Sequence, residues 1–583
     1  MAGTERIILC GGTPAPSGAN QDDLLVLDLN GADPNVNLKI TNITQRLSSD
    51  LPGVLADLIE IATYVYSADQ AITRGGEGVI AFGQNWRRKF AFCIPVRAPD
   101  VWSSPVVQDC LRDTLSFLSD DQYDFKFGKQ QKSAPIQRYL EFGESPNQQE
   151  ELDEVLLFSG GLDSLGGAVR EAVCDGRRVA LVSHRSNPKI HSKQKQLVQD
   201  LNPLCAHKPF HIPVWANKDK ALGREYTQRT RSFLYASLAY AVARAYRLDR
   251  LRFYENGVVS LNLPISEQVI GARATRTTHP QVLNGFAKLF SEISGSQFAV
   301  ENPFLWLTKG EVVDVIGDGG CAELIKHSTS CTHTLDQTKL HTHCGRCSQC
   351  VSRRFAALAS KYHGYDPAEM YKVDLLEGER EKGVDLTLVE SFIRMAKDIK
   401  AANQYQLIER FGEASRVLRH VKPLTTDEVA GRIARLHRKH AEEVTGVMEY
   451  ALASHSAQIL DETLPSNCAI ILAFPGKYRT AAITNRTEEV PRPQATPKGT
   501  KPEEKKNGRY SDRDDRVFRL VGLQTFTALT NEEIENRFRP KLRQIWGKKN
   551  PPSLDALRSC FNRIRHHHTI PLSEAINKKA VNR

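Results

Sequence analysis

The chain has 583 residues, 78 Lys and Arg against 68 Asp and Glu, a formal net charge of +10, 40% hydrophobic residues and 12 cysteines. This length indicates about three to five domains and excludes a collagen-like, wholly disordered or small disulfide-stapled protein. No apolar run reaches the roughly 18 residues of a membrane helix, and Ile7–Gly12 lacks the length and cleavage site of a signal peptide, so we expect a soluble cytoplasmic protein.

The first 150 residues mix short β-like runs with helical patterns, which predicts an N-terminal α+β domain over residues 1–150. The elements expected in it are strands at Asp23–Leu29, Gly78–Phe82 and Phe90–Val96 and helices at Val54–Ala68 and Val106–Leu118. We interpret Gly11-Gly12 and Arg74–Gly78 as turns, because neither follows a clear strand and opens a helix as a phosphate loop would.

From Val155 onward, short apolar strands alternate with helices. The expected strands are Val155–Phe158, Val179–Ser183, Phe210–Pro213 and Leu251–Tyr254. This alternation is typical of an α/β domain with a parallel sheet covered on both faces. We therefore predict a doubly wound parallel sheet within residues 151–364 and expect the catalytic core there.

A glycine-rich turn follows the first of these strands. Val155–Phe158 leads into Ser159-Gly160-Gly161-Leu162-Asp163-Ser164, and a helical run, Leu165–Val173, comes next. Backbone N–H groups and the positive end of the helix dipole would converge there and bind phosphate. The glycines would let the backbone approach the anion, the serine hydroxyls could donate hydrogen bonds, and Asp163 could hold Mg²⁺.

Four cysteines are spaced as metal ligands. Cys331 precedes Cys344-Gly-Arg-Cys347-Ser-Gln-Cys350, which contains two overlapping C-x-x-C pairs. Four thiolates form a closed tetrahedral Zn²⁺ site with no position for water, so we expect a structural metal that holds this loop to a helix starting near Ser352. An iron–sulfur cluster is the chemical alternative. The nearby His333, His341 and His343 could also substitute as ligands.

The remaining sequence predicts helices and a linker. A helical domain is expected over residues 365–486, with helices at Leu388–Ala401, Tyr405–Val421 and Thr426–Ser454. A proline-rich, charged linker follows at 487–510, and a small basic helical or winged-helix-like domain at 511–583. Residues 491–583 carry 21 Lys and Arg against 10 Asp and Glu. This tail could bind nucleic acid or an acidic protein surface, or be a solvated basic face.

The turn Ser159–Ser164 resembles the PP-loop, the S-G-G-x-D-S fingerprint of enzymes that split ATP into AMP and pyrophosphate. Together with the cysteines it resembles the QueC family, the 7-cyano-7-deazaguanine synthases. The resemblance covers about residues 153–358 and is carried at further points by Thr230–Leu234, Glu255-Asn256-Gly257, Asn302–Phe304 and Thr308–Val312.

The resemblance implies an adenine nucleotide alpha-hydrolase-like fold and an ATP-dependent ligase or synthase that adenylates a 7-carboxy-7-deazaguanine substrate, with ATP, Mg²⁺ and Zn²⁺ as cofactors. It assigns catalysis to three residues, Asp163, Arg231 and Lys309. Nucleotide binding falls to Ser159, Gly160, Gly161, Leu162, Asp163, Ser164 and Ser183. Substrate contacts are expected at Glu255, Asn256, Ser260 and Asn262, and zinc at Cys331, Cys344, Cys347 and Cys350.

The sequence departs from the family pattern after Asn256, where Val258–Pro264 replaces a tract with a tyrosine and an acidic residue. The large terminal additions resemble the bigger QueC-like proteins of bacterial antiphage defence operons, of the Qat and type IV CBASS kinds. That implies transfer of the activated substrate to an amine of a partner protein from the same operon. The alternatives are an ammonia-using synthase that forms the nitrile, and a PP-loop enzyme that modifies nucleic acid, with the basic tail as its reader.

Overall fold

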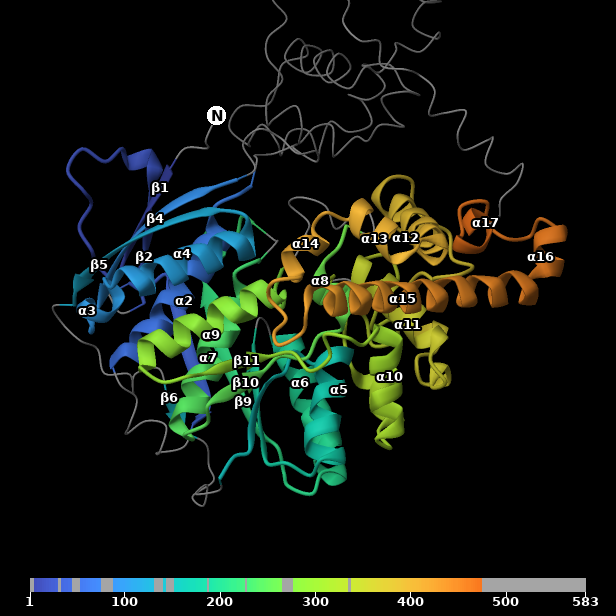
Figure 1. The fold of residues 1–583 in the computed structure, drawn as a ribbon, viewed down its shortest axis with the longest axis horizontal. Coiled ribbons are helices and arrows are strands. Elements are labelled where there is room, and N and C mark those ends of the chain that lie inside the picture. The colour runs from blue at the N-terminus through green and yellow to red at the C-terminus, as the bar shows by residue number, and fades with distance from the viewer. Residues whose placement is uncertain are drawn as a thin grey trace, which may run out of the picture. The chain divides into compact units, whose positions relative to one another are not determined.

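The computed structural model describes residues 5–29, 33–43, 53–74, 87–130, 140–142, 151–185, 188–225, 228–264, 276–333 and 337–473. All of them belong to one unit, Met1–Thr487. The strands within these ranges form two sheets, which lie side by side on helices that they share (Figure 1). The expected strand Gly78–Phe82, the linker after residue 487 and the basic domain 511–583 lie outside the described residues.

The first sheet is four-stranded and entirely parallel, in the order β2-β1-β4-β5. Its strands are β1 (Glu5–Cys10), β2 (Leu24–Leu27), β4 (Lys89–Val96) and β5 (Gln122–Lys129). Side chains alternate along β4 and β5, so that Phe90, Phe92, Tyr123, Phe125 and Phe127 stack on one buried face. The predictions at residues 23–29 and 90–96 are confirmed to within a few residues.

The second sheet is seven-stranded, in the order β11-β10-β7-β8-β9-β3-β6. Its strands are β3 (Val36–Ile43), β6 (Leu140–Phe142), β7 (Glu154–Leu157), β8 (Val179–His184), β9 (Phe210–Lys218), β10 (Arg250–Arg252) and β11 (Ala299–Glu301). The five strands from β11 to β9 are parallel, and successive connections run outward in both directions from β7. The gap between β7 and β10 is therefore the switch point of this sheet, where α/β folds commonly bind ligands.

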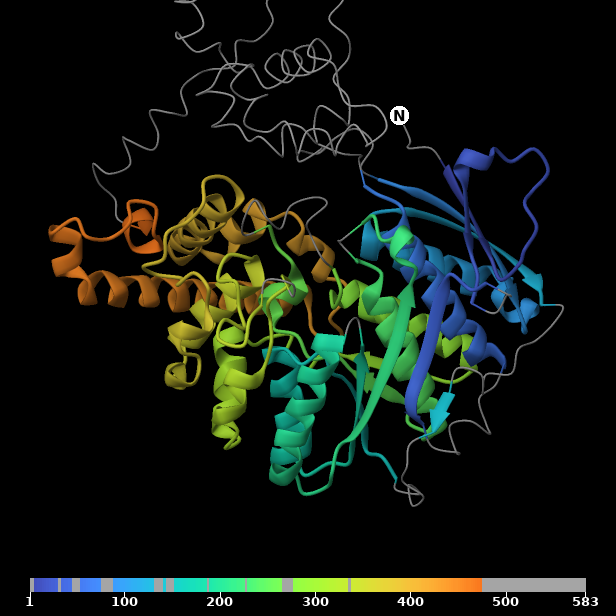
Figure 2. The same cartoon turned by 180° about the vertical axis from the view of Figure 1, so that it is seen from behind.

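The sheet is mixed, which corrects the expectation of a wholly parallel one. β3 pairs antiparallel with β9, and β6 then pairs parallel with β3. Figure 2 shows β3 in blue beside β9 in green. Two strands from the segment 1–150 thus lie in the same sheet as the strands of 151–364. A sequence pattern does not reveal this pairing, because the partners are far apart along the chain.

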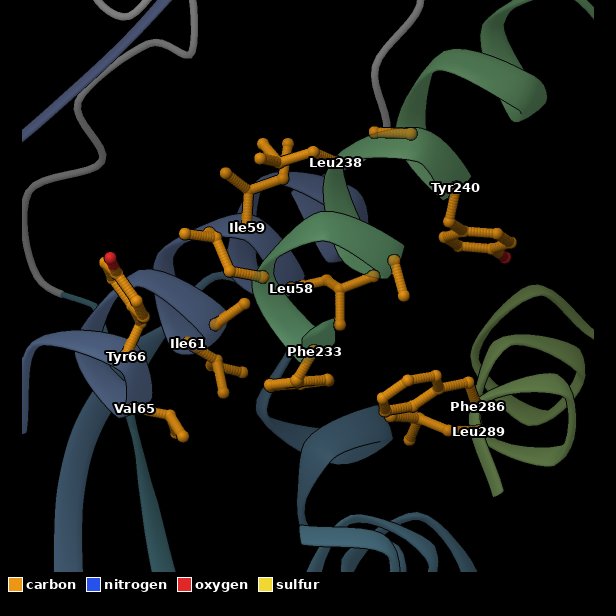
Figure 3. Packing of buried hydrophobic residues seen from close by; sticks show 14 of the residues in the cluster. Leu58, Ile59, Ile61, Val65, Tyr66, Phe233, Leu238, Tyr240, Phe286 and Leu289 are labelled. Atoms are coloured by element: carbon orange, nitrogen blue, oxygen red, sulfur yellow. The ribbon is translucent and has the colours of Figure 1, made fainter. Parts of the chain in front are cut away.

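Helix α2 (Gly53–Ala71) lies at the centre of the core that joins the sheets. Nearly every residue of α2 is buried, as expected for a helix covered on all sides. It packs with α7 (Arg231–Ala245), α4 (Pro105–Ser119) and α9 (Pro280–Ser294) in one hydrophobic cluster (Figure 3). On the other face of the second sheet lie α5 (Leu162–Ala168), α6 (Pro188–Leu201) and α10 (Lys309–Asp318).

The carboxy-terminal helices form a third cluster with part of the core. They are α12 (Val384–Ala401), α13 (Gln404–Arg410), α14 (Ala414–Val417), α15 (Thr426–Ser454), α16 (Ser456–Leu460) and α17 (Ala469–Ala473). The predicted helix 426–454 is confirmed. The single helix expected at Tyr405–Val421 is wrong: it breaks into α13 and α14 around Gly412, a residue that weakens helices. Among the described residues, no helix is long and apolar enough to cross a membrane.

Candidate functional site

The glycine-rich turn connects β7 to a helical segment that begins at Leu162, three residues earlier than expected, and ends as a π-helix, Val169–Cys174. Gly160 has a φ of +83°, which glycine adopts readily and other residues rarely do. The Ser164 hydroxyl lies 3.2 Å from both the Gly160 N–H and the Ser159 hydroxyl. These contacts hold the turn in a tight form with Ser159 exposed.

Asp163 and Lys309 form an ion pair beside this turn. The Lys309 Nζ lies 3.0 Å from an oxygen of Asp163, and Lys309 is 4% exposed. Lys309 is the first residue of α10, whose start is fixed by a capping box between Thr308 and Glu311. Asn256 donates to the other Asp163 oxygen at 3.2 Å. The turn after β7, the end of β10 and the start of α10 thus meet at Asp163.

Glu255 follows β10 and points into the same region. Its Oε2 accepts hydrogen bonds from Thr277, at 3.1 Å, and from Thr278. Burial raises the pKa of Glu255, and the negative charge of Asp163 raises it further, while Thr278 and Lys309 act in the opposite direction. This carboxyl group therefore holds a proton more readily than an exposed one.

Ser260 and Asn302 fix the backbone after β10. The Asn302 side chain donates to the Glu255 carbonyl at 2.8 Å and to the Ser260 hydroxyl at 2.9 Å. Ser260 also bonds Thr278 at 2.9 Å. Asn262 ends the short helix α8 (Gly257–Leu261) with a φ of +49°, a conformation that asparagine tolerates. Both residues shape this part of the chain, and their predicted substrate contacts stay predictions.

A cavity of about 120 Å³, here called the loop cavity, opens between these groups. Its polar lining includes Ser159, Ser164, Arg231, Glu255 and Thr278, and its apolar lining includes Phe158, Tyr235, Phe253 and Tyr254. Arg231 is exposed, and in the described part of the chain it has no ion-pair partner. A second cavity, of about 260 Å³ between α12, α15 and α17, has a mainly apolar lining whose lysines are bonded to Ala473 and Glu449.

Sequence reasoning missed several groups of the loop cavity. Tyr235 lies one helical turn after Arg231, so its position could have been inferred once α7 was recognised. Thr277 and Thr278 carry no motif. Ser183 was predicted to bind the nucleotide, but it is not among the residues that line this cavity. It is fully buried on β8 and bonds the His211 ring at 2.9 Å.

The four predicted cysteines come together as the cysteine cluster, Cys331, Cys344, Cys347 and Cys350. Their sulfur atoms all lie within 4.8 Å of one another, and the sulfurs of Cys344 and Cys350 are 3.8 Å apart. Zinc–sulfur bonds of about 2.3 Å in a tetrahedron require sulfur separations of about 3.8 Å. The cluster therefore fits a zinc ion.

The backbone around the cysteine cluster is shaped for metal ligation. Gly345 has a φ of +76°, and a Cβ there would lie 1.9 Å from the Val373 carbonyl oxygen, so only glycine fits. The N–H groups of Arg346 and Cys347 each donate to the Cys344 sulfur at 3.4 Å. The following helix, α11 (Ser348–Ala359), begins at Ser348 rather than near Ser352, so Cys350 lies in its first turn.

The protonation of the thiols and the positions of nearby histidines are also consistent with four sulfur ligands. Hydrogen bonding from Cys344 is the largest of the effects that lower the pKa of Cys331, to about 7. His343 is fully buried, and its ring nitrogens face Ser330 N–H and the Thr342 hydroxyl. Among the described residues, no histidine joins the four sulfurs. All the described cysteines are free thiols.

The cysteine cluster is linked directly to the glycine-rich turn. Thr329, two residues before Cys331, donates its N–H to the Gly160 carbonyl at 2.8 Å. The fully buried Arg353 of α11 bonds Ser328 at 2.7 Å and pairs with Asp366 at 2.8 Å. A metal that fixes residues 331–350 would therefore also fix the outer wall of the turn.

The comparisons with known proteins agree with this geometry. Residues 267–361 match the family model described as queuosine biosynthesis protein QueC. No curated protein matches the sequence. The matched stretch contains Lys309 and the whole cysteine cluster, whereas the glycine-rich turn precedes it. The chain thus has a QueC-like region. This similarity indicates relatedness to a family of ATP-using synthases of 7-deazaguanine compounds.

Proposed function

We propose that this protein uses ATP to activate the carboxylate of a 7-carboxy-7-deazaguanine-type substrate and transfers the acyl group to an amine. The main support is the cavity at the switch point of the sheet, which is lined by residues of the glycine-rich turn, Arg231 and Glu255. The ion pair of Lys309 with Asp163 lies beside the same turn. The QueC-like region supports the substrate class.

The first step joins two anions. A substrate carboxylate oxygen attacks the α-phosphorus of ATP, the bond to the β-phosphate oxygen breaks, and pyrophosphate leaves. Lys309 and Arg231 offset the repulsion between carboxylate and phosphate, and the N–H groups of the turn bind the departing pyrophosphate. Catalysis by such groups depends on their being fixed before the reaction, and the pair with Asp163 holds Lys309 in place.

The second step transfers the acyl group. An amine attacks the acyl carbon of the adenylate, AMP leaves with the former carboxylate oxygen, and the amine releases a proton. Mg²⁺ would accompany the ATP phosphates. Asp163 could contribute a ligand. Of the contacts described above, one of its oxygens pairs with Lys309 and the other accepts from Asn256, and a carboxylate oxygen can bind a metal in addition to one such contact. Zinc in the cysteine cluster would be structural, because four sulfurs fill its coordination shell.

We propose an amine of a partner protein as the acceptor, in antiphage defence. The support is the extent of the chain outside its QueC-like region. These parts include α2 and α4 in the main core and α12 to α17 in a further cluster. The basic segment 511–583 would then bind an acidic partner or nucleic acid. Its excess of Lys and Arg supports this.

The test is an incubation of the full chain with ATP labelled in the α-phosphate and 7-carboxy-7-deazaguanine, with ammonia, a protein amine or no acceptor. AMP and pyrophosphate are expected, and a deazaguanine mass is expected on the protein acceptor. Accumulation of nitrile with ammonia alone would instead identify a nitrile-forming synthase. Release of ADP and phosphate would reject the proposal altogether.

A further inference from the structure

The three residues that precede Arg231 are all held by the amino-terminal segment of the chain. Gln228 accepts a hydrogen bond from Tyr66 at 3.3 Å, Arg229 donates to the Ser119 carbonyl at 2.9 Å, and Thr230 bonds Asp69. We infer that Asp69 and Tyr66 are positioning residues that fix Arg231 for ATP binding. This inference rests on the role proposed for Arg231 and assigns a function to α2.

Asp69 caps the start of α7. One of its oxygens, Oδ2, accepts both from the Thr230 N–H and from the Thr230 hydroxyl, each at 3.0 Å. Thr230 itself makes no side-chain cap for α7, so Asp69 supplies from another helix the acceptor that a helix start requires. Arg231 is the first residue of α7, and its backbone position follows from this contact.

Asp69 is itself immobilised as an ion. It is 1% exposed, and its second oxygen pairs with Arg88 and Arg74. Both arginines also bind Asp121, which closes a buried network of four charged groups. Burial by itself would raise the pKa of Asp69, but Arg88, Arg74 and the Thr230 N–H together lower it, so the carboxylate stays charged. A charged acceptor makes the stronger hydrogen bond to Thr230.

The base of this network is buried and closely packed. α2 and α7 pack closely through apolar residues, among them Leu58, Ile61 and Phe233 (Figure 3). Arg229 is almost fully buried, and its guanidinium also lies 3.8 Å from Asp120. Residues 228–230 are thus held by contacts to α2 and to the end of α4. The next residue, Arg231, has an exposed side chain.

This anchorage matters because Arg231 has no ion-pair partner of its own in the described part of the chain. Lys309 is held by Asp163, whereas the contacts described for Arg231 act on the backbone of the residues that precede it. A displacement of about 1 Å in a catalytic group can cost up to about 100-fold in rate. Loss of the Thr230 contact should therefore reduce ATP binding and turnover through Arg231 and leave the rest of the cavity intact.

The test uses the full chain with Thr230→Val, which removes the hydroxyl and keeps the shape, and Thr230→Ser, which keeps the hydroxyl. Thr463→Val, at an exposed threonine, is the matched control. Affinity for α,β-methylene-ATP is measured by calorimetry and AMP formation by the labelled assay. We expect Thr230→Val to weaken both about tenfold and Thr230→Ser to restore most of the loss.

A double-mutant cycle with Arg231→Gln separates positioning from general stability. If Asp69 and Thr230 act through Arg231, Thr230→Val and Asp69→Asn should add almost nothing in the Arg231→Gln background. Additive losses, or unchanged nucleotide affinity in Thr230→Val, would overturn the inference. Nucleotide affinity is measured without a carboxylate substrate. The affinity of these variants would therefore still test the inference if the proposed reaction were not observed.

Discussion

The cysteine cluster and the loop cavity lie on either side of the same turn, yet they are built in opposite ways. The cluster takes its groups from residues 331–350. All four are cysteine sulfurs, and they lie within 4.8 Å of one another. The cavity takes its groups from the residues at the ends of β7 and β10, from the start of α7 and from the segment before α9. The cluster thus needs little more than one loop, whereas the cavity needs several elements that are far apart in the sequence. We therefore expect changes in the cluster to affect stability first and changes in the cavity to affect rate first.

The largest effect is expected from Cys350→Ser. It removes a buried sulfur ligand, and structural zinc contributes on the order of 10 kcal/mol to the folding of small metal-dependent domains. We expect loss of stoichiometric zinc and unfolding around residues 328–373, measured by metal analysis and hydrogen exchange. Cys174→Ser, at an exposed thiol outside the cluster, should change neither. One retained zinc and native exchange in Cys350→Ser would contradict the structural role.

Lys309→Met tests the other side of the comparison. Removing the buried cation should lower AMP formation by about 100- to 1,000-fold, because the charge that offsets carboxylate and phosphate is lost. Zinc content should stay stoichiometric, because the cysteine cluster is unchanged. Lys326→Met removes an exposed lysine paired with Glu323 and serves as the control. Near-normal AMP formation in Lys309→Met would remove this residue from the mechanism.

A further effect, on stability and not on rate, is expected from acid. Burial lowers the pKa of His184 and of His211, each to about 4, and both lie in the sheet beneath the cavity. Between pH 6.5 and 4 the unfolded chain binds protons that the folded chain does not, so stability falls as the pH falls, by up to about 1.4 kcal/mol per unit for each histidine.

Denaturant unfolding at several pH values measures this slope. His184→Gln should flatten it, whereas His207→Gln, at an exposed position, should not. A slope of the same size in His184→Gln would show that other groups carry the acid sensitivity.

The smallest effect is expected from Thr425→Ala. Thr425 and Glu428 form the capping box of α15, and that helix contacts both α11, which carries Cys350, and α10, which carries Lys309. Loss of the cap should cost about 1 kcal/mol of unfolding free energy and leave zinc content and AMP formation unchanged. Thr426→Ala, one residue further on, should cost less. A large loss of activity in Thr425→Ala would indicate that α15 does more than support the core.

The parts of this molecule that sequence predicts well are those encoded locally. Strands such as Val179–Ser183, the turn Ser159–Ser164 and the cysteine spacing each depend on neighbours in the chain, and the structure contains all three. The segment Thr230–Leu234, which carries part of the family resemblance, contains the start of α7.

The remaining features depend on distant residues. Thr277 and Thr278 can bond Glu255 because the fold brings residues 277–278 close to the end of β10. Asp69 can bond Thr230 because α2 packs against α7. Neither contact leaves a periodic or compositional signal. The domain boundary predicted at residue 150 was likewise based on local patterns. In the structure, β3 and β6 precede this boundary, yet they lie in the same sheet as the strands that follow it. Pairing across long sequence distances is what local patterns omit.

The antiparallel strand β3 also has a consequence for synthesis. Val36 pairs with Lys218 and Ile40 with Val214, so β3 leaves the ribosome well before its partner exists. At about 5–20 residues per second the wait is on the order of 10 s. During that time the edge of β3 that will bind β9 has no partner, and premature pairing with another nascent chain becomes possible. Expression of this protein should therefore improve at slow initiation rates or with chaperones that shield the first hundred residues.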